Sequence, residues 1–158
     1  MAASEIKEKF GTVTALTFVL TSLASSNVGL GKGSASVDNT TTRFGRLHLF
    51  GRVKTAASGV TANRPIWIYL LKADGHATEY GTDGWGKTDA AWTQSNAIPI
   101  ATIFTPASPS NVFLYWDAVV ENPGPTWGIG LVQYTGAALS GTAADHFLHY
   151  IGDNPENQ

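Results

Sequence analysis

The alternation of apolar and polar side chains predicts β-strands along most of this chain. In residues 44–55, Leu47, Leu49 and Val53 fall on one face, and residues 112–121 alternate with the same period of two. Residues 66–71 are instead apolar at every position (IWIYLL), which is typical of a central strand that is packed on both faces. Threonine, valine and aromatic residues mark further strands at residues 12–21, 98–105, 126–135 and 146–151, with a short one near residues 35–37.

Turn signals separate these strands, so the sequence predicts an all-β fold. We expect an antiparallel β-sandwich, with a jelly roll as one arrangement that fits, although the pattern does not give the strand order. Residues 1–11 are expected to form an N-terminal arm, either flexible or with one or two helical turns between residues 4 and 10. Residues 12–151 form a single domain. Residues 152–158 are a C-terminal tail without core-forming side chains, able to extend onto a neighbouring subunit.

The composition narrows the classes of function. The 158 residues include no cysteine, which excludes disulfides and thiolate metal sites. The net charge of −2 argues against a nucleic-acid partner, and the apolar run near residues 15–20 is too short for a membrane span. Charged residues make up 14% of the chain, below the ~25% of a typical domain. The surface is therefore expected to be largely neutral. One explanation is that this surface is buried against other subunits, since interface cores are poor in charge. The other is that a β-rich fold has little helix to carry lysine and glutamate.

No motif of an enzyme stands out. His146 and His149 lie three residues apart on an expected strand, so they point to opposite faces and make poor joint metal ligands. Asp117 and Glu121 share the polar face of another strand, where a glycosidase pair is one reading and solvated surface charges are the commoner one. The acidic residues of the long irregular segment match no calcium-binding loop; they are Asp74, Glu79, Asp83 and Asp89. We therefore expect no catalytic, cofactor-binding or metal-binding residues.

Two groups of residues favour contact with a partner. The first is a cationic stripe with one aromatic member, on the strand face opposite Leu47; it consists of Arg46, His48, Phe50, Arg52 and Lys54. This stripe is either a docking surface for an acidic partner or a solvated outer face. The second group is aromatic and lies in the irregular segment at residues 73–96: Tyr80, Trp85 and Trp92. These side chains either contact a protein or a sugar, or fold back onto the domain.

Several segments, taken in order, resemble a group of small phage and prophage virion proteins. They are residues 20–26 (LTSLASS), 35–41 (ASVDNTT), 64–75 (RPIWIYLLKADG), 80–84 (YGTDG), 100–106 (IATIFTP), 119–122 (VVEN), 136–140 (GAALS) and 147–158. The resemblance covers most of the chain. This sequence departs from the group around Trp85–Trp92 and at residues 123–130, which leaves open the virion surface it contacts.

The resemblance implies a capsid decoration (cement) protein of a tailed phage. Such a protein is located in the virion, lacks enzymatic activity and cofactors, and binds the major capsid protein as a homo-oligomer, a trimer or a dimer. It stabilises the shell by bridging coat subunits from outside. The alternative is a receptor- or carbohydrate-binding module on a tail, in which Tyr80, Trp85 and Trp92 form the sugar platform.

Overall fold

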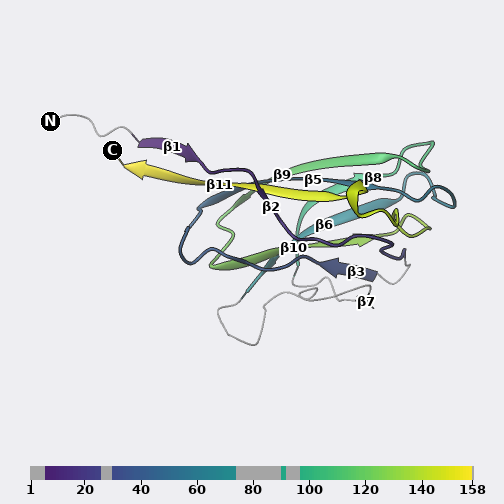
Figure 1. Cartoon of the computed structure of the whole chain (residues 1–158), viewed down its shortest axis with the longest axis horizontal. Helices are drawn as coiled ribbons and strands as arrows, with labels where there is room; N and C mark the ends of the chain where they lie inside the picture. Colours follow the sequence, from purple (N-terminus) through teal and green to yellow (C-terminus); the bar gives the residue numbers. More distant parts are fainter. Residues whose placement is uncertain (1–5, 26–29, 74–89, 92–96, 158) are drawn as a thin grey trace.

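The computed structural model describes residues 6–25, 30–73, 90–91 and 97–157, which form two antiparallel β-sheets packed face to face (Figure 1). The expected all-β sandwich is thereby confirmed. In the first sheet, the strand order is β1 (Ile6–Phe10), β11 (Phe147–Asn157), β5 (Arg46–Lys54) and β9 (Phe113–Glu121), and β2 (Thr14–Ala15) also pairs with β11. In the second sheet, the order is β7 (Ala90–Ala91), β3 (Leu30–Gly33), β10 (Thr126–Gln133), β6 (Pro65–Lys72) and β8 (Ile98–Phe104), and β4 (Val37–Asp38) also pairs with β10.

The order of the strands is that of a jelly roll. If β1 with β2, and β3 with β4, each count as one strand, the first sheet holds the first, eighth, third and sixth strands along the chain. The second sheet then holds the second, seventh, fourth and fifth strands, with the two-residue β7 added at its edge. Because neighbouring strands in both sheets come from distant parts of the sequence, this double Greek-key arrangement cannot be read from the alternation pattern alone.

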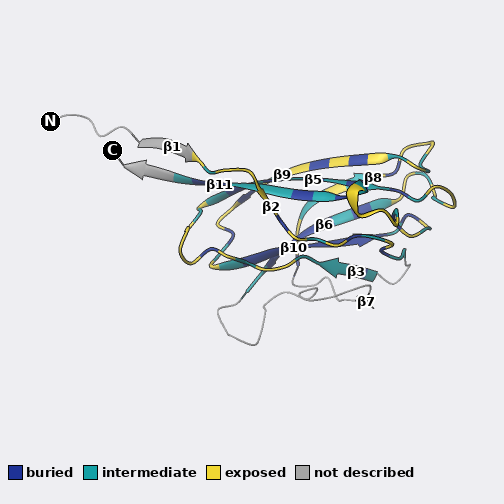
Figure 2. Ribbon diagram, viewed as in Figure 1, coloured by how far each residue is buried: buried dark blue, intermediate teal, exposed yellow. Residues whose placement is uncertain are grey.

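The core lies between the sheets and is built by alternation. Leu47, Leu49 and Val53 on β5 are fully buried, as their spacing predicts, and they face Ile66, Ile68 and Leu70 of the second sheet within one apolar cluster. Figure 2 shows the different burial of a central and an edge strand, since β10 is dark blue along nearly its whole length whereas β9 alternates between buried and exposed positions.

Strand β6 is buried on both sides, as its continuous apolar run predicts. Its alternate side chains Tyr69 and Leu71 point away from the main core into a second cluster that includes Val132 and Ala97. Burial, together with the neighbouring Tyr134, raises the pKa of Tyr69 to about 12, so this phenol stays neutral over the physiological range.

Residues 12–21 do not form the long strand that their composition predicts. Only Thr14–Ala15 pairs as β2, and the segment then anchors through Leu16, Leu20 and Leu23, which are all buried in the core. Their spacing of four and three residues does not fit the period of two that a strand requires. The composition favoured a strand, but the positions of the leucines did not.

The two terminal segments pair with each other. Residues 6–10, for which a helical turn was considered, form the strand β1 instead and lie opposite residues 153–157 of β11. The expected domain boundary at residue 152 therefore falls inside β11, which is eleven residues long. In Figure 1 this two-stranded ribbon extends past the rest of the sandwich, with the N- and C-termini close to its tip.

Candidate functional site: the outer face of the first sheet

The predicted cationic stripe lies on the solvent side of the first sheet. All five of its residues alternate with the buried side chains of β5 and are half-buried. Because β5 is flanked by β11 and β9, the stripe forms the middle of a wider surface, which we call the outer face. It comprises the outward side chains of β1, β11, β5 and β9: Phe10; Phe147, His149, Ile151 and Asp153; Arg46, His48, Phe50, Arg52 and Lys54; and Phe113, Tyr115, Asp117, Val119 and Glu121.

Arg52 is held between two aromatic rings. Its guanidinium carbon lies 4.5 Å from the ring centre of Phe113 and 5.0 Å from that of Phe147. Its Nη2 donates a hydrogen bond of 2.7 Å to the carbonyl of Ala144, and its Nε donates one of 3.3 Å to the carbonyl of Asp145. The charge is thus stacked and hydrogen-bonded within the protein, an arrangement for which the planar guanidinium is well suited.

At the other end of the stripe, Asp153 holds Arg46 and His48 together. Its side chain is only 2% exposed, and its Oδ2 accepts a hydrogen bond of 3.2 Å from Arg46 Nε. His48 Nε2 lies 2.9 Å from the same oxygen, at an angle outside hydrogen-bond geometry, and the His48 ring packs against Phe10 with 6.1 Å between centres. This cluster fixes the base of the β1–β11 ribbon to β5.

Lys54 is paired as well. Its Nζ lies 3.3 Å from Asp145 Oδ2, which also accepts a 2.6 Å hydrogen bond from Ser140 Oγ. The hydrogen bond from Ser140, aided by Lys54, lowers the pKa of Asp145 below its ordinary value. With Arg46, Arg52 and Lys54 all satisfied internally, the outer face is not a free cationic patch, and its geometry gives no support to an acidic partner.

What the outer face offers instead is exposed apolar and aromatic surface. Tyr115 is 64% exposed, Phe10 62%, Val119 55% and Phe113 39%, although side chains of these types are usually buried in a monomer. Aromatic and arginine side chains are also the types enriched at the energetic centres of protein interfaces. The combination of exposed rings with fixed, paired ions is suited to docking a protein surface of mixed apolar and neutral polar character.

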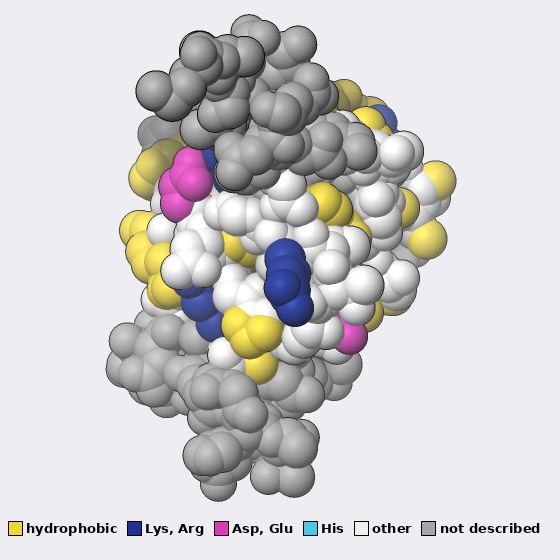
Figure 3. Space-filling model, turned by 90° about the vertical axis from the view of Figure 1, so that its left-hand side faces the viewer, with side chains coloured by type: hydrophobic (Ala, Val, Ile, Leu, Met, Phe, Trp, Pro, Cys, Tyr) yellow, Lys and Arg dark blue, Asp and Glu magenta, His cyan; other side chains and the backbone are white. Residues whose placement is uncertain are grey.

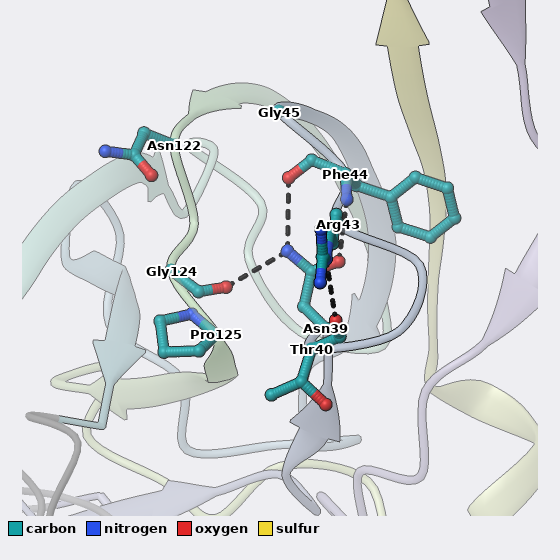
Figure 4. A pocket seen from close by; sticks show the side chains of 8 residues that line it. All are labelled: Asn39, Thr40, Arg43, Phe44, Gly45, Asn122, Gly124 and Pro125. Carbon is teal, nitrogen blue, oxygen red and sulfur yellow. Dashed lines mark hydrogen bonds between the residues drawn. The ribbon is translucent and has the colours of Figure 1, made fainter.

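A hollow lies at the end of the sandwich, between residues 39–45 and residues 122–125, and has a volume of ≈ 460 Å³ (Figure 4). The amide of Asn39 in its wall donates to the carbonyls of Phe44 (3.1 Å) and Gly124 (3.0 Å), and its oxygen accepts from the backbone N–H of Phe44 (2.8 Å). Asn39 is therefore fully used in joining two loops. The hollow is a structural joint and offers a ligand few unpaired groups.

The remaining candidate residues form no site within the described part of the chain. Tyr80, Trp85 and Trp92 lie outside the described residues, as do the acidic residues Asp74 to Asp89, so the carbohydrate platform stays a prediction. Asp117 and Glu121 both lie on the outer face, four residues apart on β9, which corresponds to about 13 Å between Cα atoms. Because both side chains project from the same side of one strand, they do not face each other across a substrate as the paired carboxyl groups of glycosidases do.

His146 and His149 are separated, as expected. His146 is buried at the end of the 3₁₀ turn η1 (Ala143–Asp145), where its Nε2 lies 3.0 Å from the carbonyl of Ser140, whereas His149 stacks on Phe50 of the outer face. Within the part of the chain that the structure describes, no three His, Cys, Asp or Glu side chains gather as they would around a metal ion. None of the helical turns described there is long and apolar enough to cross a membrane.

The stripe on β5 was identified from the sequence, but the residues of β9 and β11 that lie beside it on the outer face were not. The alternation on β9 already placed Phe113, Tyr115 and Val119 opposite the buried side chains, so their exposure was predictable from the period alone. Asp153 had no such signal, because it lies 107 residues from Arg46 in the sequence and was assigned to the C-terminal tail.

Comparisons with known proteins add little to this picture. No family model matches the chain, and neither does any curated protein. Among solved structures, the chain is similar to one described as "Crystal structure of infectious bursal disease virus VP2 subviral particle", with 12% identity and a TM-score of 0.23. The alignment covers 98% of this chain and 42% of that chain, so this chain spans less than half of the other's length. At such a TM-score the likeness carries no argument about function.

Proposed function

We propose that this chain is a non-enzymatic structural protein of a phage particle, which binds the outside of the capsid and stabilises it by bridging coat subunits. The observation that carries the proposal is the outer face, a continuous sheet surface with exposed Phe10, Tyr115 and Val119, on which the arginine and lysine side chains of β5 are already paired within the chain. The resemblance to phage virion proteins supplies the identity of the partner, the major capsid protein.

The rest of the surface supports a role in assembly. On the end of the molecule shown in Figure 3, backbone, uncharged polar side chains and hydrophobic side chains make up most of the described surface, and charged side chains are few. Neutral polar groups lose less hydration free energy than ions when they are buried, so such a surface is suited to contact with neighbouring subunits. Jelly rolls occur in viral capsid proteins and in lectins, so the fold by itself favours neither.

Cementing needs no catalysis. A protein that binds only the assembled shell shifts the equilibrium toward that shell, and many copies add their contributions. In this account the outer face contacts the coat, the chain acts as a homo-oligomer in the virion, and the rigid sandwich holds the exposed rings in place so that little conformational entropy is lost on docking.

The test compares two phenylalanines of nearly equal exposure on different sheets. Phe10 belongs to the outer face and is 62% exposed, whereas Phe104 lies on β8 of the second sheet and is 60% exposed. Capsids prepared without this chain are mixed with purified wild-type protein, Phe10→Ala or Phe104→Ala, and binding is measured by co-sedimentation. We expect Phe10→Ala to weaken binding about tenfold, the effect of losing one aromatic contact at an interface centre. Phe104→Ala should bind as the wild type does.

Capsids with the protein bound should also withstand heat and low salt better than capsids without it. Equal resistance of the two preparations would contradict the cementing role. Failure to bind capsids, together with saturable glycan binding that a Trp85→Ala/Trp92→Ala double variant abolishes, would favour the tail-module alternative.

A further inference from the structure

One edge of the first sheet has a row of backbone hydrogen-bonding groups that no described residue pairs with. Strand β9 ends that sheet, and within the described residues β5 is its one hydrogen-bonded neighbour. The edge strand of the other sheet, β8, packs near β9 across the sandwich but does not pair with it. A regular, unpaired edge strand can accept another strand.

The flanking hydrogen bonds show which residues present this free edge. At the two ends of the β5–β9 ladder, the N–H of Asn122 donates to the carbonyl of Gly45, and the N–H of Thr55 donates to the carbonyl of Val112. In an antiparallel ladder the residues that bond to the neighbour alternate with residues that point away from it. Even-numbered residues of β9 therefore bond to β5. The N–H and C=O groups of the odd-numbered residues 113–121 face outward.

Other edges in the described part of the fold carry protective features that β9 lacks. In β8, Pro99 removes one N–H, and the register shifts between Ile68 and Tyr69 of its partner strand. The sequence of β1 places lysines at positions 7 and 9, and β7 is only two residues long. Proline, irregular register, lysine and short length are the usual means of blocking edge pairing. Strand β9 has nine residues in unbroken register, with neither proline nor lysine.

We propose that β9 pairs antiparallel with β9 of a second copy of this chain, about a two-fold axis at Trp116. This register places Phe113 opposite Val119 of the partner copy, and Tyr115 opposite its Asp117, so that three exposed side chains gain cross-strand contacts. The register centred one residue later, at Asp117, places two carboxylates directly opposite each other, which is destabilising. Of these two registers, the charge pattern favours the one centred at Trp116, in which the strand pairs with its own copy without like charges opposite each other.

The dimer joins the two first sheets edge to edge into one continuous sheet. The outer faces of both copies then form a single surface with twice the area, related by the two-fold axis. This inference does not rest on the proposed function, since pairing of β9 is measured on the purified protein without any capsid. A dimer that failed to bind capsids would leave the pairing intact, and a monomer that bound capsids would overturn the pairing alone.

The first test places a lysine on the edge. Val119→Lys puts an ammonium opposite Phe113 twice in each dimer, and Val19→Lys is the matched control, because Val19 is 58% exposed, against 55% for Val119, and lies outside β9. By light scattering after size exclusion and by sedimentation velocity, we expect a wild-type dimer. Val119→Lys should raise the dimer dissociation constant at least about tenfold, and Val19→Lys should leave it unchanged. Circular dichroism and thermal melting report whether each variant is folded.

The second test reads the register and does not depend on Val119→Lys folding. Tyr115→Asp places two carboxylates opposite each other across the interface and should dissociate the dimer, whereas Tyr115→Asp/Asp117→Lys restores opposite charges and should restore it. Rescue is specific to the axis at Trp116, since an axis at Asp117 would bring two lysines together. A wild-type monomer at every concentration, an oligomer that Val119→Lys does not weaken, or no rescue by the double variant would each overturn the proposal.

Discussion

At the scale of single residues, the arginine and lysine side chains of the stripe are each held by acidic or carbonyl groups of the same chain. The alternation pattern placed the five stripe residues on one face of β5 correctly, because side-chain direction follows from the strand period. The pairing of those charges was not predictable, since Asp153 and Asp145 come from the C-terminal part of the chain and meet Arg46 and Lys54 only after the sheet has formed. The stripe was interpreted as cationic because its acidic partners lie far from it in the sequence, although they are close to it in the fold.

Asp145 provides a test of this pairing by pH. Its folded-state pKa lies below its ordinary value of 3.8, so the carboxylate stabilises the fold above about pH 4, and this contribution is lost as the pH falls through the folded-state pKa. Asp145→Asn should therefore be less stable than the wild type at pH 6, and the difference should shrink by pH 3. The measurement is the free energy of unfolding by urea at several pH values.

Ser140→Ala serves as the companion variant for that experiment. It removes the 2.6 Å hydrogen bond that contributes most to lowering the pKa of Asp145, so the folded-state pKa moves back toward its ordinary value, and the loss of stability on acidification should be smaller than in the wild type and complete at higher pH. A stability difference between wild type and Asp145→Asn that is the same at pH 6 and pH 3 would contradict the assigned role of this carboxylate.

At the scale of elements, the hydrophobic pattern predicted the strands that bury one or both faces. It failed for residues 12–21, whose buried leucines do not follow the period of a strand. Strands β5, β6 and β9 lie where the pattern placed them, because each needs one or both faces buried at a period of two. The terminal strands were missed because residues 6–10 and 153–157 carry few apolar side chains and are ordered by pairing with each other. Long-range pairing of polar segments leaves little local signal in a sequence.

Two glycines near the base of the β1–β11 ribbon make a matched prediction. A Cβ at Gly152 would overlap the ring of Phe44, whereas a Cβ at Gly45 would meet nothing within 4 Å. Gly152→Ala should therefore lower the free energy of unfolding by about 1–3 kcal/mol, the usual cost of overpacking. Gly45→Ala should change it by less than about 0.5 kcal/mol. Urea denaturation measures both, and equal stabilities for the two variants would contradict the close packing of β11 against Phe44.

At the scale of the whole molecule, the sandwich is a rigid support for one exposed sheet surface. The sequence could predict the fold class, but not the jelly-roll order, because that order depends on which distant strands become neighbours. The low fraction of charged residues also indicated a role in contact with other subunits. The outer face itself could not be predicted, because it forms only when β1, β11, β5 and β9 lie side by side in one sheet. In this account the function depends on that surface, because many unrelated proteins share the fold.

Hydroxyl-radical footprinting of the protein, free and bound to capsids that were prepared without it, tests the central claim most directly. Side chains that become buried at an interface lose reactivity, so each exposed ring reports on its own position. The account predicts that Phe10 is protected on the capsid, while Phe104, equally exposed on the second sheet, reacts as in the free protein. Protection of Phe104 with Phe10 unchanged, or unchanged reactivity of both rings in capsid-bound protein, would contradict it.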